Sequence, residues 1–109
     1  MKNIVGLVDD SVKKKMIKMK VSTFEEQNRL SEINFAIDQL QHSVRTGIPI
    51  PKHLIPHQYV KRYHVDNLWK YDLSNGWRLL YFVIAEQDTT IAVIIDWMSH
   101  KEYERLFGY

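Results

Sequence analysis

Residues 67–98 read NLWKYDLSNGWRLLYFVIAEQDTTIAVIIDWM, and this stretch decides the fold. It contains three β-prone runs separated by short polar segments: residues 67–73, 77–85 and 89–98. The segment Ser74-Asn-Gly76 between the first two runs is typical of a hairpin turn. We therefore expect a three-stranded antiparallel meander. The third run is rich in β-branched residues and almost entirely apolar, which predicts a strand at the middle of the sheet, covered on both faces.

The N-terminal part of the chain indicates one strand followed by a short helix. Residues 4–8 are mostly apolar and β-prone, and Asp9 and Asp10 follow them. Because aspartate side chains favour turns and helix caps, we expect the strand to end there and a helix to begin near Ser11. Apolar residues then recur at spacings of four and three as far as Met19, with lysines on the other face.

The clearest helix pattern begins after a capping residue. Ser22 or Thr23 supplies that cap, and acidic residues follow it. Apolar residues recur at spacings of three and four from Leu30 to Val44, and Gly47 suits the left-handed position after a helix end. We therefore expect this helix to end at Gly47, where nearby prolines prevent it from resuming.

The remaining segments are a connector and a short terminal helix. Residues 48–66 contain three prolines, which indicates an irregular connector with one helical turn over residues 58–62 and no regular strand. At the other end of the chain, Ser99 predicts a cap for a helix over residues 100–107, and Gly108 is expected to end it.

Together these elements predict one α+β domain over residues 1–109. The N-terminal strand is expected to pair with the third strand of the meander and so complete a four-stranded sheet. The helical hairpin is expected to cover one face of that sheet, and the short C-terminal helix follows the meander. No internal repeat or linker divides the chain.

The composition excludes several classes of function. Of the 109 residues, 45% are hydrophobic and 26% charged, which excludes wholesale disorder and low-complexity sequence. The absence of cysteine excludes disulfides, thiolate zinc sites, iron–sulfur clusters and cysteine nucleophiles. No apolar run approaches the roughly 20 residues that span a bilayer, and the first residues lack the pattern of a signal peptide. We therefore expect a cytoplasmic protein with no membrane partner.

The net charge of +2 conceals an uneven distribution of charged residues. Residues 1–23 have six lysines against two aspartates, and residues 45–78 have six basic residues against two acidic ones. The second of these basic segments also holds three histidines and several aromatic residues, a composition suited to nucleic acid. A solvated surface is the simpler explanation, and a basic RNA-binding or adaptor protein is an alternative.

Metal and cofactor motifs are absent from the sequence. His53 and His57 have helical spacing, but Pro56 lies between them and no carboxylate cluster supplies a third ligand. There is no glycine-rich phosphate loop and no nucleophile-elbow motif. We therefore expect no metal and no other cofactor.

Three segments in this order of elements resemble a known family. They are residues 67–73 (NLWKYDL), residues 76–81 (GWRLLY) and residues 95–103 (IDWMSHKEY). In the most specific part, a strand with Leu-Trp leads through a glycine turn into an aromatic-Arg-apolar-apolar-Tyr strand. Over nearly its whole length, the chain resembles the RelE/ParE superfamily of toxins from type II toxin–antitoxin systems.

The resemblance implies a small toxin that a cognate antitoxin neutralises. RelE-like members enter the ribosomal A site and cut mRNA without metal, whereas ParE-like members share the fold and poison DNA gyrase. The resemblance favours a RelE-like, ribosome-dependent mRNA endoribonuclease that inhibits translation, with the ribosome and mRNA as partners. A ParE-like gyrase inhibitor, or a toxin that binds without catalysis, is the alternative.

Metal-free RNA cleavage needs a base near the attacking 2′-hydroxyl, cations around the phosphate and an acid at the leaving 5′-oxygen. Arg78 stands where the family has a strand arginine, which can hold a phosphate in two hydrogen bonds; the alternative is an ion pair with Asp72 or Asp96 across the sheet. His100 and Tyr103 are three residues apart in the last expected helix and share one face of it. The resemblance implies a catalytic role for both. Alternatively, His100 helps to cap the helix and Tyr103 packs on the sheet.

Four further basic residues are predicted to bind substrate: Lys70, Lys101, Lys61 and Arg62. The best-known RelE pattern has two lysines alternating on the first meander strand. Here Lys70 matches one of them, and the other position falls on an apolar residue. That departure makes His100, His64 or Lys61 the candidates for the base. In some relatives the last tyrosine takes part, so Tyr109 competes with Tyr103 for the functional role.

Overall fold

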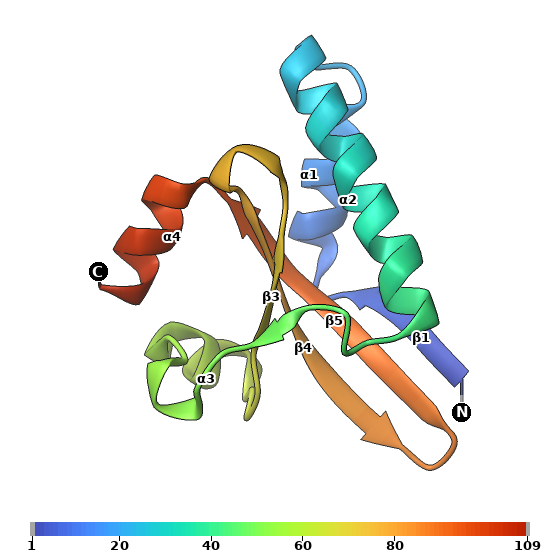
Figure 1. The fold of residues 1–109 in the computed structure, drawn as a ribbon, viewed down its shortest axis with the longest axis vertical. Helices are drawn as coiled ribbons and strands as arrows, with labels where there is room; N and C mark the ends of the chain where they lie inside the picture. The colour runs from blue at the N-terminus through green and yellow to red at the C-terminus, as the bar shows by residue number, and fades with distance from the viewer. Residues whose placement is uncertain (1, 109) are drawn as a thin grey trace.

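The computed structural model describes residues 2–108 and contains a five-stranded mixed sheet with helices on both sides (Figure 1). The strands are β1 (Lys2–Leu7), β2 (Ile48–Pro49), β3 (Trp69–Asp72), β4 (Arg78–Glu86) and β5 (Thr89–Met98). The α-helices are α1 (Asp10–Met19), α2 (Phe24–His42), α3 (His57–Tyr63) and α4 (His100–Phe107). Two short 3₁₀ helices are η1 (Lys52–Leu54) and η2 (Ser74–Gly76). The predicted α+β class is confirmed.

The strand order of the sheet is β1-β5-β4-β3-β2. Strands β3, β4 and β5 form the predicted antiparallel meander. Strand β1 pairs with β5 in parallel, with Lys2 opposite Thr89 and Leu7 opposite Ile94, as expected. The expectation that β5 lies in the middle of the sheet is wrong: β4 has that place, because β2 adds a strand beyond β3.

The prediction of a four-stranded sheet is wrong by this one strand. In β2, Ile48 pairs with Lys70 and Pro49 with Trp69. A proline has no backbone N–H to donate, so it is tolerated in an edge strand such as β2. Two residues of pairing leave no periodic pattern in the sequence, which is why the connector is predicted to be irregular throughout.

Helix α2 ends at His42 and not, as predicted, at Gly47. Ser43 has an extended backbone with φ −156°, and its N–H donates to the carbonyl of Gln39. The glycine serves a different purpose. A Cβ at Gly47 would lie 2.5 Å from the Tyr81 hydroxyl, so only a glycine lets the loop approach β4 this closely.

The predicted helix caps are mostly confirmed. Asp9 caps α1 by accepting hydrogen bonds from two backbone N–H groups, and Thr23 caps α2. Ser99 and Glu102 form a reciprocal capping box at the start of α4, and Gly108 ends that helix with φ +74°. These local signals fix where α4 begins, and therefore where its side chains meet the sheet.

Two apolar cores lie on the two faces of the sheet. Helices α1 and α2 pack on one face around Ile33, Leu79 and Trp97. Helices α3 and α4 cover part of the other face, around Leu80 and Tyr103. Neighbouring residues on β4 thus face different cores. Within residues 2–108, no helix combines the length and the apolar character needed to cross a membrane.

Candidate functional site

Strands β3 and β4 and helix α4 bring several predicted site residues together on the α3–α4 side of the sheet. Arg78 pairs in register with Asp72, and Lys70 pairs with Leu80, so these side chains lie on the same face. A Cβ built on Gly76, in the β3–β4 turn, would lie 3.0 Å from the Cβ of the first residue of α4, so the turn and the helix are in contact. We call the resulting group the Arg78 site; it consists of Lys70, Asp72, Arg78, His100 and Tyr103.

The guanidinium of Arg78 is held at the end of the hairpin. Its Nη1 donates to the carbonyls of Gly76 (2.5 Å) and Trp77 (3.3 Å), and the side chain is 17% exposed. Its Nε lies 3.0 Å from Asp72 Oδ1, which is ion-pair distance but not hydrogen-bond geometry. Among residues 2–108, the Nε and Nη2 groups have no hydrogen-bond acceptor. Nη2 can therefore still donate, whereas Nε is buried beside Asp72.

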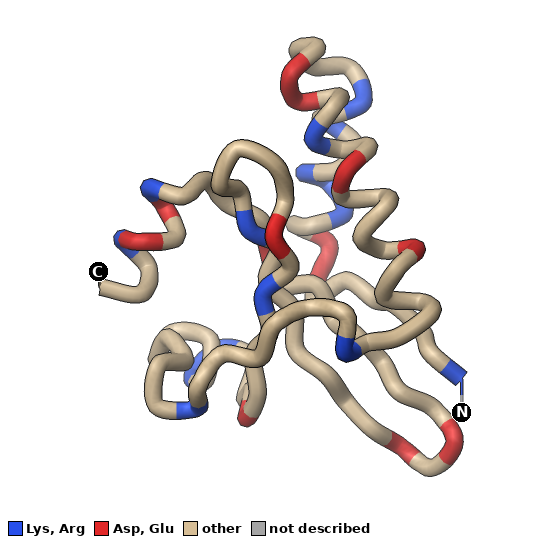
Figure 2. The backbone as a smooth tube through the Cα atoms, in the orientation of Figure 1, with Lys and Arg blue, Asp and Glu red and all other residues tan. Residues whose placement is uncertain are grey.

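Lys70 places a second positive charge beside the first. Its Nζ lies 3.5 Å from the same oxygen, Asp72 Oδ1, and the carboxylate of Asp72 is half exposed. Figure 2 shows that basic and acidic positions are interspersed along the backbone as a whole. Both cations also lie over the ring of Tyr103, at 5.9 Å for Lys70 Nζ and 5.4 Å for Arg78 Cζ. An aromatic ring attracts cations to its face, so Tyr103 helps to gather these two. The two cations exceed the one carboxylate by one charge.

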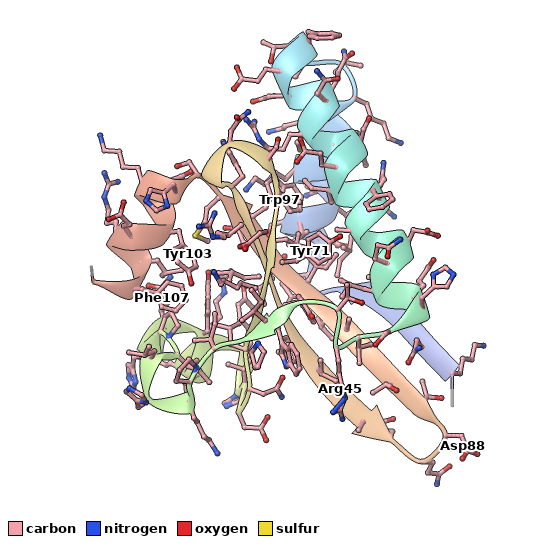
Figure 3. All side chains as sticks on the ribbon, in the orientation of Figure 1. Arg45, Tyr71, Asp88, Trp97, Tyr103 and Phe107 are labelled. Carbon is pink, nitrogen blue, oxygen red and sulfur yellow. The ribbon has the colours of Figure 1, made fainter. Side chains whose placement is uncertain are left out.

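Tyr103 is a core residue at this site. It is 7% exposed, points from α4 toward the sheet, and packs against Phe107 with 4.5 Å between ring centroids (Figure 3). This is the packing alternative that the sequence left open. The face of the Tyr103 ring lies against the charged groups of Lys70 and Arg78.

His100 is the exposed member of the site. Its side chain is 58% exposed, and Nε2 lies 2.8 Å from Glu104 Oε1, one turn along α4. Ser99 and Glu102 form the cap of α4, so His100 is not needed for that role. The exposed part of its imidazole can therefore meet a substrate at the edge of the site, while Glu104 holds the ring through Nε2.

The other predicted binding residues lie apart from this group. Lys101 is exposed on α4, and Lys61 is exposed on α3. Arg62 lies over the ring of Tyr63 and lines a separate hollow of about 310 Å³ that also includes Asp96. Among the described residues, no contact links Lys61 or Arg62 to the Arg78 site.

Of the two remaining predicted alternatives, the structure places only His64. His64 ends α3 in the left-handed conformation, with φ +56°. Tyr109 lies outside the residues that the structure describes. Within residues 2–108, His64 has no contact with the Arg78 site.

Glu32 is a residue of the site's surroundings that the sequence pattern did not indicate. Its two carboxylate oxygens accept hydrogen bonds from the backbone N–H (2.7 Å) and the hydroxyl (2.5 Å) of Ser74. This contact ties the β3–β4 turn to α2, on the far side of the sheet from Arg78. A glutamate on an exposed helix face usually contacts only solvent, so no local signal could have revealed the contact.

The geometry can bind an oxyanion and exchange a proton beside it. Two cations sit on a rigid pair of strands, and an imidazole lies at the edge on the first turn of α4. Within residues 2–108, no group of three or more potential metal-ligating side chains comes together.

Comparison of the chain with protein-family models, with curated proteins and with solved structures gave no match. Any function must therefore be proposed from the residues of this chain.

Proposed function

We propose that this protein is a RelE-like toxin of a type II toxin–antitoxin system and cuts mRNA on the ribosome. The single observation that supports the proposal most strongly is the convergence of Lys70 and Arg78 on one carboxylate oxygen of Asp72, on a hairpin whose turn contacts the exposed His100. An RNA phosphate carries the same charge as that carboxylate and offers more acceptor oxygens. It can therefore take the carboxylate's place between the two cations.

In the proposed reaction, the 2′-oxygen attacks the neighbouring phosphorus and the bond from phosphorus to the 5′-oxygen breaks. The products are a 2′,3′-cyclic phosphate and a 5′-hydroxyl. Arg78 and Lys70 stabilise the charge that develops on the non-bridging oxygens. His100 either takes the proton from the 2′-hydroxyl or gives one to the leaving 5′-oxygen, water carries out the other proton transfer, and Glu104 orients the His100 ring. The ring of Tyr103 holds the two cations in place.

The experiment uses ribosomes programmed with a defined mRNA and incubated with purified protein. We expect cleavage within the A-site codon, product ends of the kind just described, and no cut where the attacking nucleotide is 2′-deoxy. Arg78→Gln and His100→Gln are expected to lower the cleavage rate by about 100-fold or more. Lys52→Ala is a matched control because it removes an exposed lysine of η1 outside the site. Cleavage at the wild-type rate by both site variants would refute the assignment.

One observation favours the alternative of a binding toxin. Arg78 is paired with Asp72 and His100 with Glu104, and the ring of Tyr103 is buried, so each predicted catalytic group already has contacts within the chain. Inhibition of gyrase supercoiling with mRNA left intact would support a ParE-like protein and reject the nuclease.

A further inference from the structure

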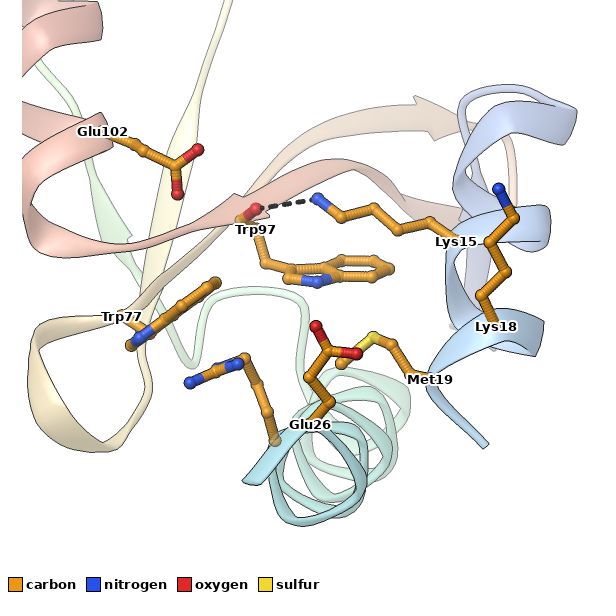
Figure 4. A pocket seen from close by; sticks show the side chains of 8 residues that line it. Lys15, Lys18, Met19, Glu26, Trp77, Trp97 and Glu102 are labelled. Carbon is orange, nitrogen blue, oxygen red and sulfur yellow. Dashed lines mark hydrogen bonds between the residues drawn. The ribbon is translucent and has the colours of Figure 1, made fainter. Parts of the chain in front are cut away.

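A pocket lies around the end of the sheet from the Arg78 site. It measures about 330 Å³ and lies between the helical hairpin α1–α2 and the ends of β4 and β5 (Figure 4). We call it the tryptophan pocket; its main lining residues are Lys15, Lys18, Arg29, Trp77, Trp97 and Glu102. A pocket of this size is in the lower part of the range for small-molecule sites.

The tryptophan pocket adjoins the Arg78 site through neighbouring residues. Trp77 immediately precedes Arg78 at the start of β4, and the two side chains belong to opposite sides of the sheet. In the same way, Glu102 lines the pocket and the next residue, Tyr103, lies in the Arg78 site. A strand of RNA that passes around this end of the sheet can therefore contact both places.

Cations line one part of the tryptophan pocket. Arg29 is 11% exposed, and its guanidinium lies 3.4 Å from the centre of the Trp77 ring. Within residues 2–108, its one hydrogen bond goes to Glu25, so other N–H groups of this covered guanidinium have no acceptor. Lys18 forms no ion pair with any described residue. Glu26 also lines the pocket and brings a carboxylate into the same space. The pocket thus holds unused donors of Arg29 and Lys18, together with an acidic side chain, next to a flat aromatic wall.

A carboxylate on another side of the pocket can accept hydrogen bonds. Glu102 uses Oε1 in the cap of α4, where it accepts from the Ser99 N–H and hydroxyl at 3.0 Å each. These hydrogen bonds lower the pKa of Glu102, so the side chain is ionised at neutral pH. Figure 4 shows its carboxylate at the edge of the pocket, beside the end of β5 that carries Trp97. The second oxygen remains available to accept from a ligand.

We propose that the tryptophan pocket binds one nucleotide of the RNA strand that is held at the Arg78 site. The base lies against the stacked Arg29 and Trp77 side chains, an exocyclic amino group donates to Glu102, and Lys18 contacts the phosphate. Uracil has no amino group and presents carbonyl oxygens instead, so adenine, guanine and cytosine bind better than uracil. That the nucleotide belongs to an RNA strand held at the Arg78 site rests on the proposed function. The binding of a nucleotide by the residues of the pocket does not rest on it.

The first test titrates the four nucleoside monophosphates without ribosomes and follows tryptophan fluorescence. We expect saturable quenching by AMP, GMP and CMP, and binding of UMP weaker by about 5-fold or more. Lys18→Ala is expected to weaken binding about 5-fold, whereas the matched control Lys14→Ala, on the same helix but outside the pocket, leaves it unchanged. Glu102→Gln keeps a residue that can cap α4 and is expected to abolish the discrimination against UMP. Equal affinities for all variants would overturn the proposal.

The second test separates this pocket from the Arg78 site. An RNA tetranucleotide with 2′-deoxy positions cannot be cut by 2′-hydroxyl attack, and we expect it to bind at least 10-fold more tightly than a monophosphate. Arg78→Gln is expected to weaken binding of the tetranucleotide and to leave the affinity for AMP unchanged. Loss of AMP binding in Arg78→Gln would overturn the proposal, because the nucleotide would then lie at the Arg78 site. Binding of AMP in the pocket without mRNA cleavage would support the pocket and reject the nuclease.

Discussion

Replacing Tyr81 by phenylalanine tests how the loop after α2 is fixed to the sheet. The Tyr81 hydroxyl is buried, donates to the carbonyl of Val44 at 2.8 Å and accepts from the N–H of Gly47 at 3.1 Å. The ring would remain in Tyr81→Phe, but the two backbone groups would lose their partner in a place that water does not reach easily. A buried group left unsatisfied in this way costs about 1–3 kcal/mol. We expect a loss of about 2 kcal/mol in the free energy of unfolding.

The assay is urea unfolding followed by circular dichroism, with a thermal melt beside it. For a domain of this size, 2 kcal/mol corresponds to a fall in Tm of about 8 °C. Tyr71→Phe is the matched control, because Tyr71 lies on β3 against the same core and its hydroxyl has no hydrogen bond with any residue from 2 to 108. The reasoning fails if Tyr81→Phe changes the free energy of unfolding by less than about 0.5 kcal/mol, or if the control loses as much.

Three further outcomes follow from the structure. Burial raises the pKa of Tyr81 to about 12, above the value near 10 in an unfolded chain. The contribution of the neutral Tyr81 to the free energy of unfolding is therefore fully present below pH 10 and is lost as the pH rises toward 12. In urea titrations at alkaline pH, the free energy of unfolding of Tyr81→Phe should fall less than that of the wild type, by about 3 kcal/mol. Gly47→Ala places a Cβ 2.6 Å from the Lys70 carbonyl and should cost about 2 kcal/mol in urea unfolding, a prediction that an unchanged midpoint would reject. Asp72→Asn removes the carboxylate that both cations share and should tighten binding of a non-cleavable RNA about 5-fold, whereas Asp88→Asn in the β4–β5 turn should not.

Sequence patterns predict best the elements that depend on interactions between residues close together in the chain. The meander and α4 were predicted with nearly correct bounds, because alternation, a turn glycine and the cap at Ser99 all act within a few residues. Strand β2 escaped prediction because its pairing depends on Gly47 lying against Tyr81, 34 residues away. The same holds for the contact between Glu32 and Ser74, which are 42 residues apart.

The candidate site was predicted in part. The sequence placed Arg78, His100 and Tyr103 near one another, and the structure brings them to one end of the sheet. The sequence alone could not show whether these side chains are exposed or already in contact with other residues of the chain. The burial of Tyr103 and the ion pair of Arg78 depend on how α4 and the strands pack together. In the same way, the sequence could not show that the placement of α3 directs the Arg62 side chain into a hollow apart from the Arg78 site.

The most direct test of the central claim, that Arg78 and His100 act on the same phosphate, is a double-mutant cycle. Single-turnover cleavage of ribosome-bound mRNA is measured for the wild type, Arg78→Gln, His100→Gln and the double variant, each checked for folding by circular dichroism. Groups that serve one transition state are not additive, so we expect the double variant to be only a few-fold slower than the slower single variant. Rate losses that multiply in full, or wild-type protein that leaves the mRNA intact, would contradict the account.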